Sequence, residues 1–171
     1  MKQKKSFEQF PRGFVTVWIV YSLLLYAIGA YILSKFGLII MSLYLLYCFA
    51  IEINVLYRSC RSCSYYGKLC GFGKGWLCST LFQKDDPKKF MQKEITFTAL
   101  IPDFFVLIFP VVGGIIGLFY SFSFLCLGLI ITLIILHLGG NSILRGSYAC
   151  KYCKQRELGC PAIDLFEKKK K

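Results

Sequence analysis

The sequence predicts an all-α integral membrane protein with four transmembrane helices arranged as two helical hairpins. Three observations predict this class. Of the 171 residues 56% are hydrophobic, the apolar residues form runs long enough to cross a bilayer, and the basic residues flank these runs. A soluble domain usually has a smaller apolar share, about 45–50%. An aromatic content of 17% also excludes a disordered chain, which is typically poor in aromatic residues.

Each predicted span is a run of about 20 apolar residues, the length that a helix needs to cross the hydrocarbon core. A short turn containing Lys35 separates the first two runs. The last apolar stretch is too long for one helix, so we expect it to turn back near residues 120–123. The predicted spans are residues 14–33, 37–57, 96–118 and 122–141. They form one membrane domain, 1–171, with two cysteine-rich hydrophilic segments, 58–94 and 145–171.

The basic residues predict the orientation. All but Lys35 of the 21 lysines and arginines lie before the first span or in the two hydrophilic segments. Because basic loops stay in the cytosol, we expect both termini there, with anionic lipid headgroups as partners. Orientation thus explains the net charge of +12 without nucleic acid. Alternatively, residues 1–30 form a cleaved signal peptide, which would leave three spans and remove the charge asymmetry.

Seven of the nine cysteines lie in the hydrophilic segments, and their spacing repeats. The pattern Cys-x2-Cys-x6-Cys begins at Cys60 after the second span and again at Cys150 after the fourth. This is compatible with a duplicated two-helix unit about a pseudo-twofold axis. In a reducing cytosol such patterns more often bind metal than form disulfides. The candidate ligands are Cys60, Cys63, Cys70, Cys78, Cys150, Cys153 and Cys160, with His137 as a further donor.

The sequence leaves the number of metal ions open. The first segment alone offers four cysteines, whereas the second offers three and would need His137. In a different partition, the two Cys-x-x-Cys pairs share one ion. Zinc is the favoured cofactor, and an iron–sulfur cluster is the alternative because Pro161 follows Cys160, as in bacterial ferredoxin motifs. A third interpretation needs no metal: basic neighbours lower the thiol pKa for dithiol–disulfide cycling, or the juxtamembrane cysteines carry palmitate.

Three ionisable side chains, Glu52, Asp103 and His137, lie within the predicted spans. Such residues usually face the interior of a bundle or a cavity. The trio predicts an ion, proton or substrate site near the cytosolic face, whereas the alternative is that each side chain is satisfied separately. At the membrane surface we expect Trp76 and the terminal lysines Lys168, Lys169, Lys170 and Lys171.

These observations favour a multi-pass membrane protein whose cytosolic cysteine motifs bind zinc and thereby organise a binding or interaction surface. The hydrophilic segments are too short to build much core, and metal binding stabilises comparable peptides by about 10–16 kcal/mol. One alternative is a redox or electron-transfer component with an iron–sulfur cluster or cycling dithiols. Another is a small carrier or enzyme that uses the polar trio. The sequence has no nucleophile elbow and no dinucleotide fingerprint, so it does not decide whether the protein is an enzyme. A protein partner and a homo-oligomer are both compatible with it.

Overall fold

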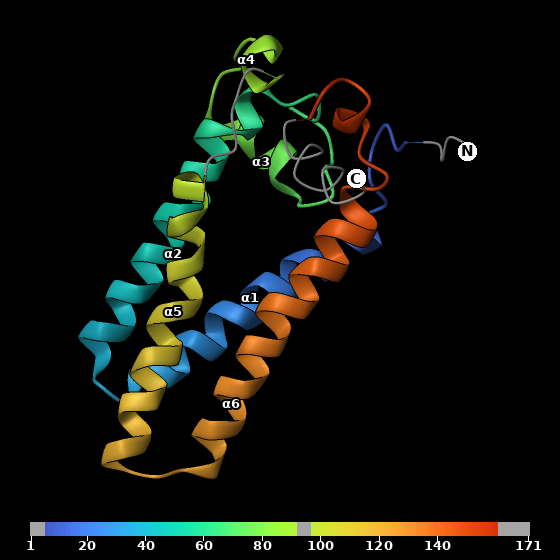
Figure 1. The fold of residues 1–171 in the computed structure, drawn as a ribbon. Helices are drawn as coiled ribbons and strands as arrows, with labels where there is room; N and C mark the ends of the chain where they lie inside the picture. Colours follow the sequence, from blue (N-terminus) through green and yellow to red (C-terminus); the bar gives the residue numbers. More distant parts are fainter. Residues whose placement is uncertain (1–5, 92–96, 161–171) are drawn as a thin grey trace. The chain divides into compact units, whose positions relative to one another are not determined.

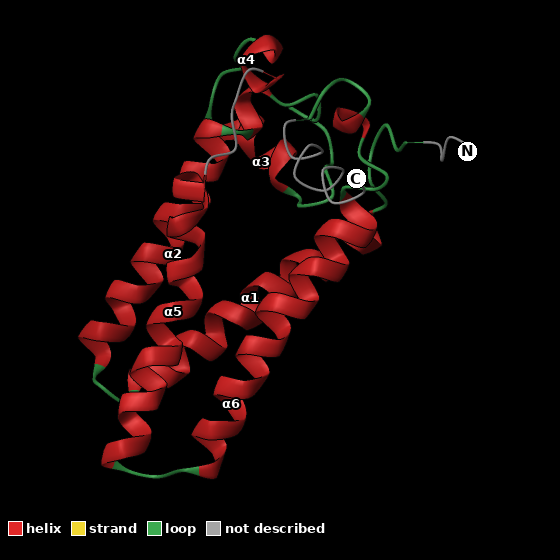
Figure 2. Ribbon diagram, viewed as in Figure 1, coloured by secondary structure: helices red, strands yellow, loops and turns green. Residues whose placement is uncertain are grey.

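The computed structural model describes residues 6–91 and 97–160, and it is 75% helical, with no strand among these residues. The predicted all-α class is confirmed. The α-helices of the described residues are α1 (Arg12–Ser34), α2 (Leu38–Arg58), α3 (Lys74–Leu81), α4 (Pro87–Met91), α5 (Phe97–Tyr120) and α6 (Phe124–Ile135) (Figures 1 and 2). The chain continues after α6 in π-helical segments over Leu136–Gly140 and Ser142–Ala149. Single 3-10 turns lie at Cys60–Ser62 and Lys154–Arg156.

Four helical stretches are long and apolar enough to cross a membrane, as the sequence predicts. They are Arg12–Ser34, Leu38–Ser62, Ile101–Tyr120 and Phe124–Ala149. They expose many large apolar side chains, which lipid contact accommodates because lipid tails are as apolar as the side chains. The structure therefore indicates an integral membrane protein. The hairpin arrangement and the internal repeat stay predictions.

The chain divides into two compact units. The helical unit comprises Val20–Glu52 and Phe97–Ile143. The cysteine-rich unit comprises Met1–Ile19, Ile53–Thr96 and Leu144–Lys171. It therefore gathers both predicted hydrophilic segments together with the N-terminal segment.

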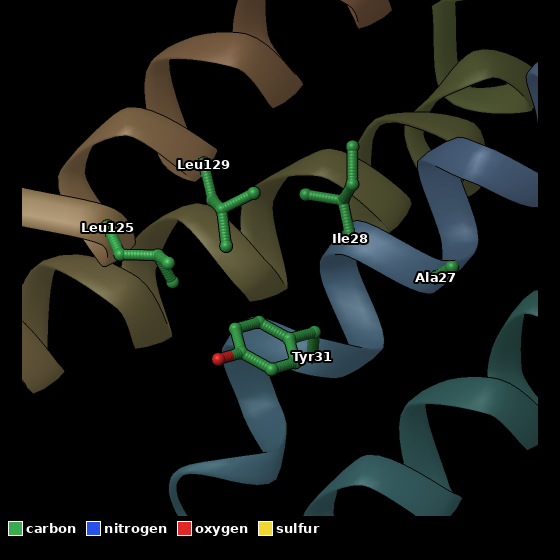
Figure 3. A pocket seen from close by; sticks show the side chains of 5 residues that line it. All are labelled: Ala27, Ile28, Tyr31, Leu125 and Leu129. Atoms are coloured by element: carbon green, nitrogen blue, oxygen red, sulfur yellow. The ribbon is translucent and has the colours of Figure 1, made fainter.

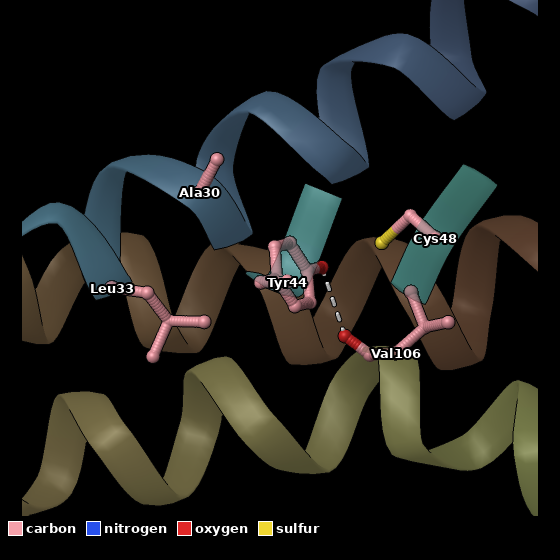
Figure 4. Close-up of a cluster of buried hydrophobic side chains, with 5 residues drawn as sticks. All are labelled: Ala30, Leu33, Tyr44, Cys48 and Val106. Carbon is pink, nitrogen blue, oxygen red and sulfur yellow. Dashed lines mark hydrogen bonds between the residues drawn. The ribbon is translucent and has the colours of Figure 1, made fainter. Parts of the chain in front are cut away.

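In the helical unit, α1, α2 and α5 meet in a cluster of buried side chains (Figure 4). Its members are Ala30, Leu33, Tyr44, Cys48 and Val106. Gly29 of α1 permits the close approach of α2, because a Cβ at this position would collide with the ring of Tyr44. Small residues at helix contacts are a common way for membrane helices to gain packing area.

A proline explains a hydrogen bond between two of these helices. Pro110 lies inside α5 and has no N–H, so it leaves the carbonyl of Val106, four residues earlier, without its helical donor. The hydroxyl of Tyr44 on α2 donates to this carbonyl at 3.0 Å (Figure 4). A neighbouring helix therefore satisfies the backbone group that the proline frees, as an apolar environment requires.

A second cluster joins α1 to α6. Its buried members are Leu25, Ile32, Ile130 and Leu133. Gly114 of α5 packs against this cluster, since a Cβ there would overlap Ile130 and closely approach Ile32. Gly113 similarly lies against Leu33. Glycines on α5 thus allow close contact with α1 and α6 within the same chain.

Candidate metal centre

Backbone hydrogen bonds hold the three segments of the cysteine-rich unit together. The N–H of Phe7 donates to the carbonyl of Tyr152, and the N–H of Phe10 donates to the carbonyl of Leu69, both at 2.9 Å. These bonds tie the N-terminal segment to both cysteine motifs. A mixed aromatic and thiol cluster fills the unit. Its buried members are Phe10, Val15, Tyr65 and Cys70, and Cys63 and Cys153 pack against them.

The two Cys-x-x-Cys pairs adopt the same backbone turn. The N–H of Cys63 donates to the carbonyl of Cys60 at 3.3 Å, and the N–H of Cys153 donates to the carbonyl of Cys150 at 3.4 Å. The carbonyls of Cys63 and Cys153 each then accept an N–H from the residue three positions later, at 3.1 Å. The repeated spacing is therefore matched by repeated local geometry. Turns of this kind bring two cysteines within reach of one ion.

Cys70 and Cys78 are buried within the first motif. Cys78 lies on α3, is 0% exposed, and has its sulfur 3.5 Å from the carbonyl oxygen of Leu56. The sulfur of Cys70 accepts the backbone N–H of Gly75 at 3.3 Å. Gly75 fits there because it has no Cβ, which would come within 2.6 Å of the carbonyl oxygen of Lys68. Hydrogen bonds from backbone N–H groups stabilise a thiolate, the form that binds metal.

All seven thiols outside the apolar core of the spans lie within electrostatic range of at least one other thiol. Some interacting pairs lie within one motif, and others join a thiol of the first motif to a thiol of the second. They join Cys60 to Cys63, Cys70 and Cys78; Cys63 to Cys70, Cys153 and Cys160; Cys70 to Cys78; and Cys150 to Cys153 and Cys160. The seven cysteines that the sequence singles out all belong to the cysteine-rich unit, and their role as metal ligands stays a prediction.

Burial raises the pKa of four of the thiols in the cysteine-rich unit, those of Cys63, Cys78, Cys150 and Cys153. The pKa of Cys153 rises to about 12, and the pKa values of Cys63 and Cys150 also lie above the ordinary thiol value. Arg145 and Arg156 lower the pKa of Cys150, but burial and the nearby thiols outweigh them. The expectation that basic neighbours lower the thiol pKa is therefore wrong in net direction. A protonated thiol is a poor nucleophile and a poor metal ligand, so this environment opposes dithiol–disulfide cycling and requires a bound metal to displace the thiol protons.

Tyr65 joins the segments and is a residue that sequence reasoning missed. Its side chain is 2% exposed. Its hydroxyl accepts the N–H of Lys154 at 2.9 Å and donates to the carbonyl of Phe7 at 2.5 Å. Burial raises the pKa of Tyr65 to about 12, so the hydroxyl stays protonated and serves both partners. The sequence feature that could have identified Tyr65 is its position two residues after Cys63.

Arg145 is the second such residue. Its guanidinium carbon lies 5.7 Å from the centre of the Trp18 ring and 5.4 Å from that of Phe72. These cation–π contacts join the start of α1, the glycine-rich loop around Phe72 and the last helical segment. Because Arg145 also interacts electrostatically with Cys150, it places positive charge beside the cysteine cluster.

As they stand, the described residues contain no group of three or more His, Cys, Asp or Glu side chains in a geometry that holds a metal ion. Protonated thiols have no mutual attraction that would draw their sulfur atoms to the ligand distance of about 2.3 Å from a zinc ion. A bound metal would therefore require sulfur positions that differ from those in the structure. The cluster supplies what such a site needs: soft donors, backbone N–H groups and surroundings poor in water.

Two members of the predicted polar trio have tyrosine neighbours in the helical unit. Glu52 accepts the hydroxyl of Tyr26 at 2.6 Å. Asp103 lies within electrostatic range of Tyr47, whose hydroxyl donates to the carbonyl of Pro102 at 2.8 Å. Each carboxyl therefore lies near a phenol of a neighbouring helix. Convergence of the trio on one site stays a prediction.

His137 lies in the π-helical segment Leu136–Gly140. Its carbonyl accepts the side-chain amide of Asn141 at 2.7 Å, and the preceding carbonyl, of Leu136, accepts the hydroxyl of Tyr21. A π-helical turn has hydrogen bonds between residues five positions apart, and such turns often occur at functional sites. His137 belongs to the helical unit, so its predicted role as a metal ligand stays a prediction.

The predicted membrane-surface residues are described only in part. Trp76 lies on α3 and is 59% exposed, and Leu77 and Leu81 of the same helix are also exposed. Exposed tryptophan and leucine side chains on a short helix are typical of membrane interfaces. The terminal lysines 168–171 lie outside the described residues.

A hollow of about 450 Å³ lies between α1 and α6 in the helical unit (Figure 3). It is lined by Ala27, Ile28, Tyr31, Leu125 and Leu129. Apart from the hydroxyl of Tyr31, these side chains offer only hydrocarbon. The hollow therefore lacks the converging polar groups that a catalytic site requires.

Comparison of the chain with protein-family models, curated proteins and solved structures finds no match.

Proposed function

We propose that the protein is a multi-pass membrane protein whose seven extramembrane cysteines bind zinc, and that the metal organises the cysteine-rich unit as a binding or interaction surface. One observation carries the proposal. Two Cys-x-x-Cys turns of the same geometry, separated by 90 positions in the sequence, contribute thiols to one aromatic cluster.

The composition of the unit supports a structural metal. Its main cluster has four buried members, two of which are Tyr65 and Cys70. A core this small usually needs a disulfide or a metal to fold stably. All nine cysteines are free thiols, so the seven outside the apolar core of the spans are available as ligands.

A structural zinc ion suits this site better than a redox dithiol does. It accepts four thiolate ligands in tetrahedral geometry and has no redox activity. An iron–sulfur cluster is the second candidate because it also needs four cysteines.

The charge distribution supports a cytosolic position for both termini and for the cysteine-rich unit. Its basic surface and the exposed Trp76 suit anionic lipid headgroups, and the same face can take a protein partner or a second copy of the chain.

Metal analysis tests the proposal on full-length protein purified in detergent without oxygen. We expect zinc bound to the chain and no visible absorption. Cys153→Ser should lower the zinc content, whereas Cys126→Ala, which alters a thiol in the helical unit, should leave it unchanged. Iron with acid-labile sulfide would support the redox alternative instead. Seven free thiols without any metal would contradict both metal interpretations.

A further inference from the structure

The hollow between α1 and α6 is an apolar surface that the fold holds in place (Figure 3). Its partly buried lining residues, Ile28 and Leu129, pack against the buried cluster that joins the two helices. Tyr31 and Leu125 are 46% and 58% exposed, and the exposed Ala27 leaves room because its side chain is a single methyl group. The volume of about 450 Å³ falls within the range of ligand pockets. Such a lining suits a hydrocarbon chain.

Lys35 places a positive charge beside this hollow. Its ammonium nitrogen lies 5.5 Å from the centre of the Tyr31 ring, a cation–π distance. Lys35 belongs to the short turn that joins α1 to α2, and both helices are long and apolar enough to cross a membrane. A turn between two spans lies at a membrane surface, at the level of the lipid headgroups. Tyr31 therefore links an apolar space to a cation at headgroup level.

The charge of Lys35 is isolated in the sequence. Every other lysine and arginine lies before the first span or in the two hydrophilic segments. Residues 9–51 and 104–156 contain no aspartate or glutamate, so neither helix that lines the hollow carries a carboxylate. The charge beside the hollow is therefore positive, and it is complementary to an anion that lies at the same membrane surface.

We propose that the hollow binds an anionic phospholipid, with one acyl chain against the apolar lining and the headgroup phosphate at the ammonium group of Lys35. A phospholipid joins the two chemistries that lie side by side here, a hydrocarbon chain and a phosphate anion. Lysine forms charge-assisted hydrogen bonds with phosphate, and basic residues between transmembrane helices recognise anionic headgroups. A zwitterionic lipid has the same phosphate but no net charge, so it should bind more weakly. The inference needs only membrane-spanning helices and does not depend on zinc.

Photolabelling tests the proposal on the full-length protein in phosphatidylcholine vesicles. Trace phosphatidylglycerol and trace phosphatidylcholine, each with a photoactivatable acyl chain, are compared, and the labelled peptides are identified by mass spectrometry. We expect about fivefold stronger labelling of residues 27–35 and 124–129 by phosphatidylglycerol, because one lysine near a membrane surface contributes about 1 kcal/mol. Lys35→Gln should remove this preference. Lys88→Gln, which alters an exposed lysine of α4, is the matched control and should retain it.

A second pair of variants tests the hollow itself. Ala27→Phe fills the hollow with hydrocarbon, so it should lower the labelling of residues 27–35 and 124–129 by both lipids. Ala50→Phe makes the same change at an exposed position of α2 that does not line the hollow. This control should leave the labelling unchanged.

The outcomes decide the proposal separately from metal binding. Equal labelling of the hollow by the two lipids in the unaltered protein would overturn it, and so would an equal loss of preference in Lys35→Gln and Lys88→Gln. An unlabelled hollow in a protein that is dimeric by light scattering would assign the hollow to a second copy of the chain instead. Should Ala27→Phe fail to fold, the lipid preference of the unaltered protein and of Lys35→Gln still decides. Each of these results leaves zinc binding intact.

Discussion

At the scale of single residues, the cysteine-rich unit depends on buried polar groups whose partners come from distant segments. Tyr65 shows this most clearly, since its hydroxyl serves backbone groups of Phe7 and Lys154. The side chains of Glu8 and Lys154 also form an ion pair between two segments. Lys154 holds the pKa of Glu8 below its ordinary value, but the carboxyl is fully exposed. Exposed ion pairs are screened by water and contribute little, so the buried hydroxyl is the more important link.

Tyr65→Phe removes this link without changing the ring. The N–H of Lys154 and the carbonyl of Phe7 then lose a partner in a buried place, which costs about 1–3 kcal/mol. We expect a lower unfolding midpoint for the cysteine-rich unit, measured by tryptophan fluorescence of the full-length protein. Tyr120→Phe is the matched control, because Tyr120 is 86% exposed. Equal midpoints for the two variants would show that the hydroxyl of Tyr65 is not a structural link.

At the scale of secondary-structure elements, the helical unit is held by contacts that compensate for helix-breaking residues. Pro110 frees the carbonyl of Val106 in α5, and Tyr44 of α2 satisfies it. Gly29 of α1 makes room for the same tyrosine. One side chain therefore links three helices, and its contribution depends on the proline.

A double-mutant cycle tests this dependence. Tyr44→Phe should destabilise the helical unit by about 0.6 kcal/mol, the average for hydrogen bonds between membrane helices, and by at most about 1.7 kcal/mol. In a Pro110→Ala background the carbonyl of Val106 regains its own helical donor, so the cost of Tyr44→Phe should fall toward zero. The measurement is unfolding of the full-length protein in mixed micelles of increasing denaturing detergent. A cost of the same size in both backgrounds would refute the coupling.

At the scale of the whole molecule, the sequence predicts the fold class and the four spans well, because a bilayer imposes a fixed apolar length. Two ends differ. The second span was predicted to end at residue 57 and the fourth at residue 141, whereas the helical stretches continue to Ser62 and Ala149. Hydropathy reports where the apolar residues end, while helical hydrogen bonds continue into polar sequence. The π-helical turns after Ile135 are an example.

The candidate site could be predicted only as a list of cysteines. Their spacing is local and visible, and all seven positions belong to the cysteine-rich unit. Which thiols are neighbours depends on contacts between distant segments, such as that of Ser64 with Gln155. The thiol pKa was predicted in the wrong direction because burial, which outweighs the basic neighbours, is a property of the folded unit.

The two units should differ in what stabilises them. Packing and interhelical hydrogen bonds hold the helical unit, whereas under the proposed function metal binding supplies much of the folding free energy of the cysteine-rich unit. Removal of the metal should then unfold one unit and leave the other in place.

Hydrogen exchange followed by mass spectrometry tests whether zinc stabilises the cysteine-rich unit and not the helical unit. The full-length protein is measured in detergent, before and after zinc is chelated under reducing conditions. Peptides that cover residues 60–78 and 144–160 should lose protection when zinc is removed and regain it when zinc is restored. Peptides from α5 and α6 should keep theirs, which serves as the internal control. Unchanged protection in the cysteine-rich peptides, or equal loss in both units, would contradict the account.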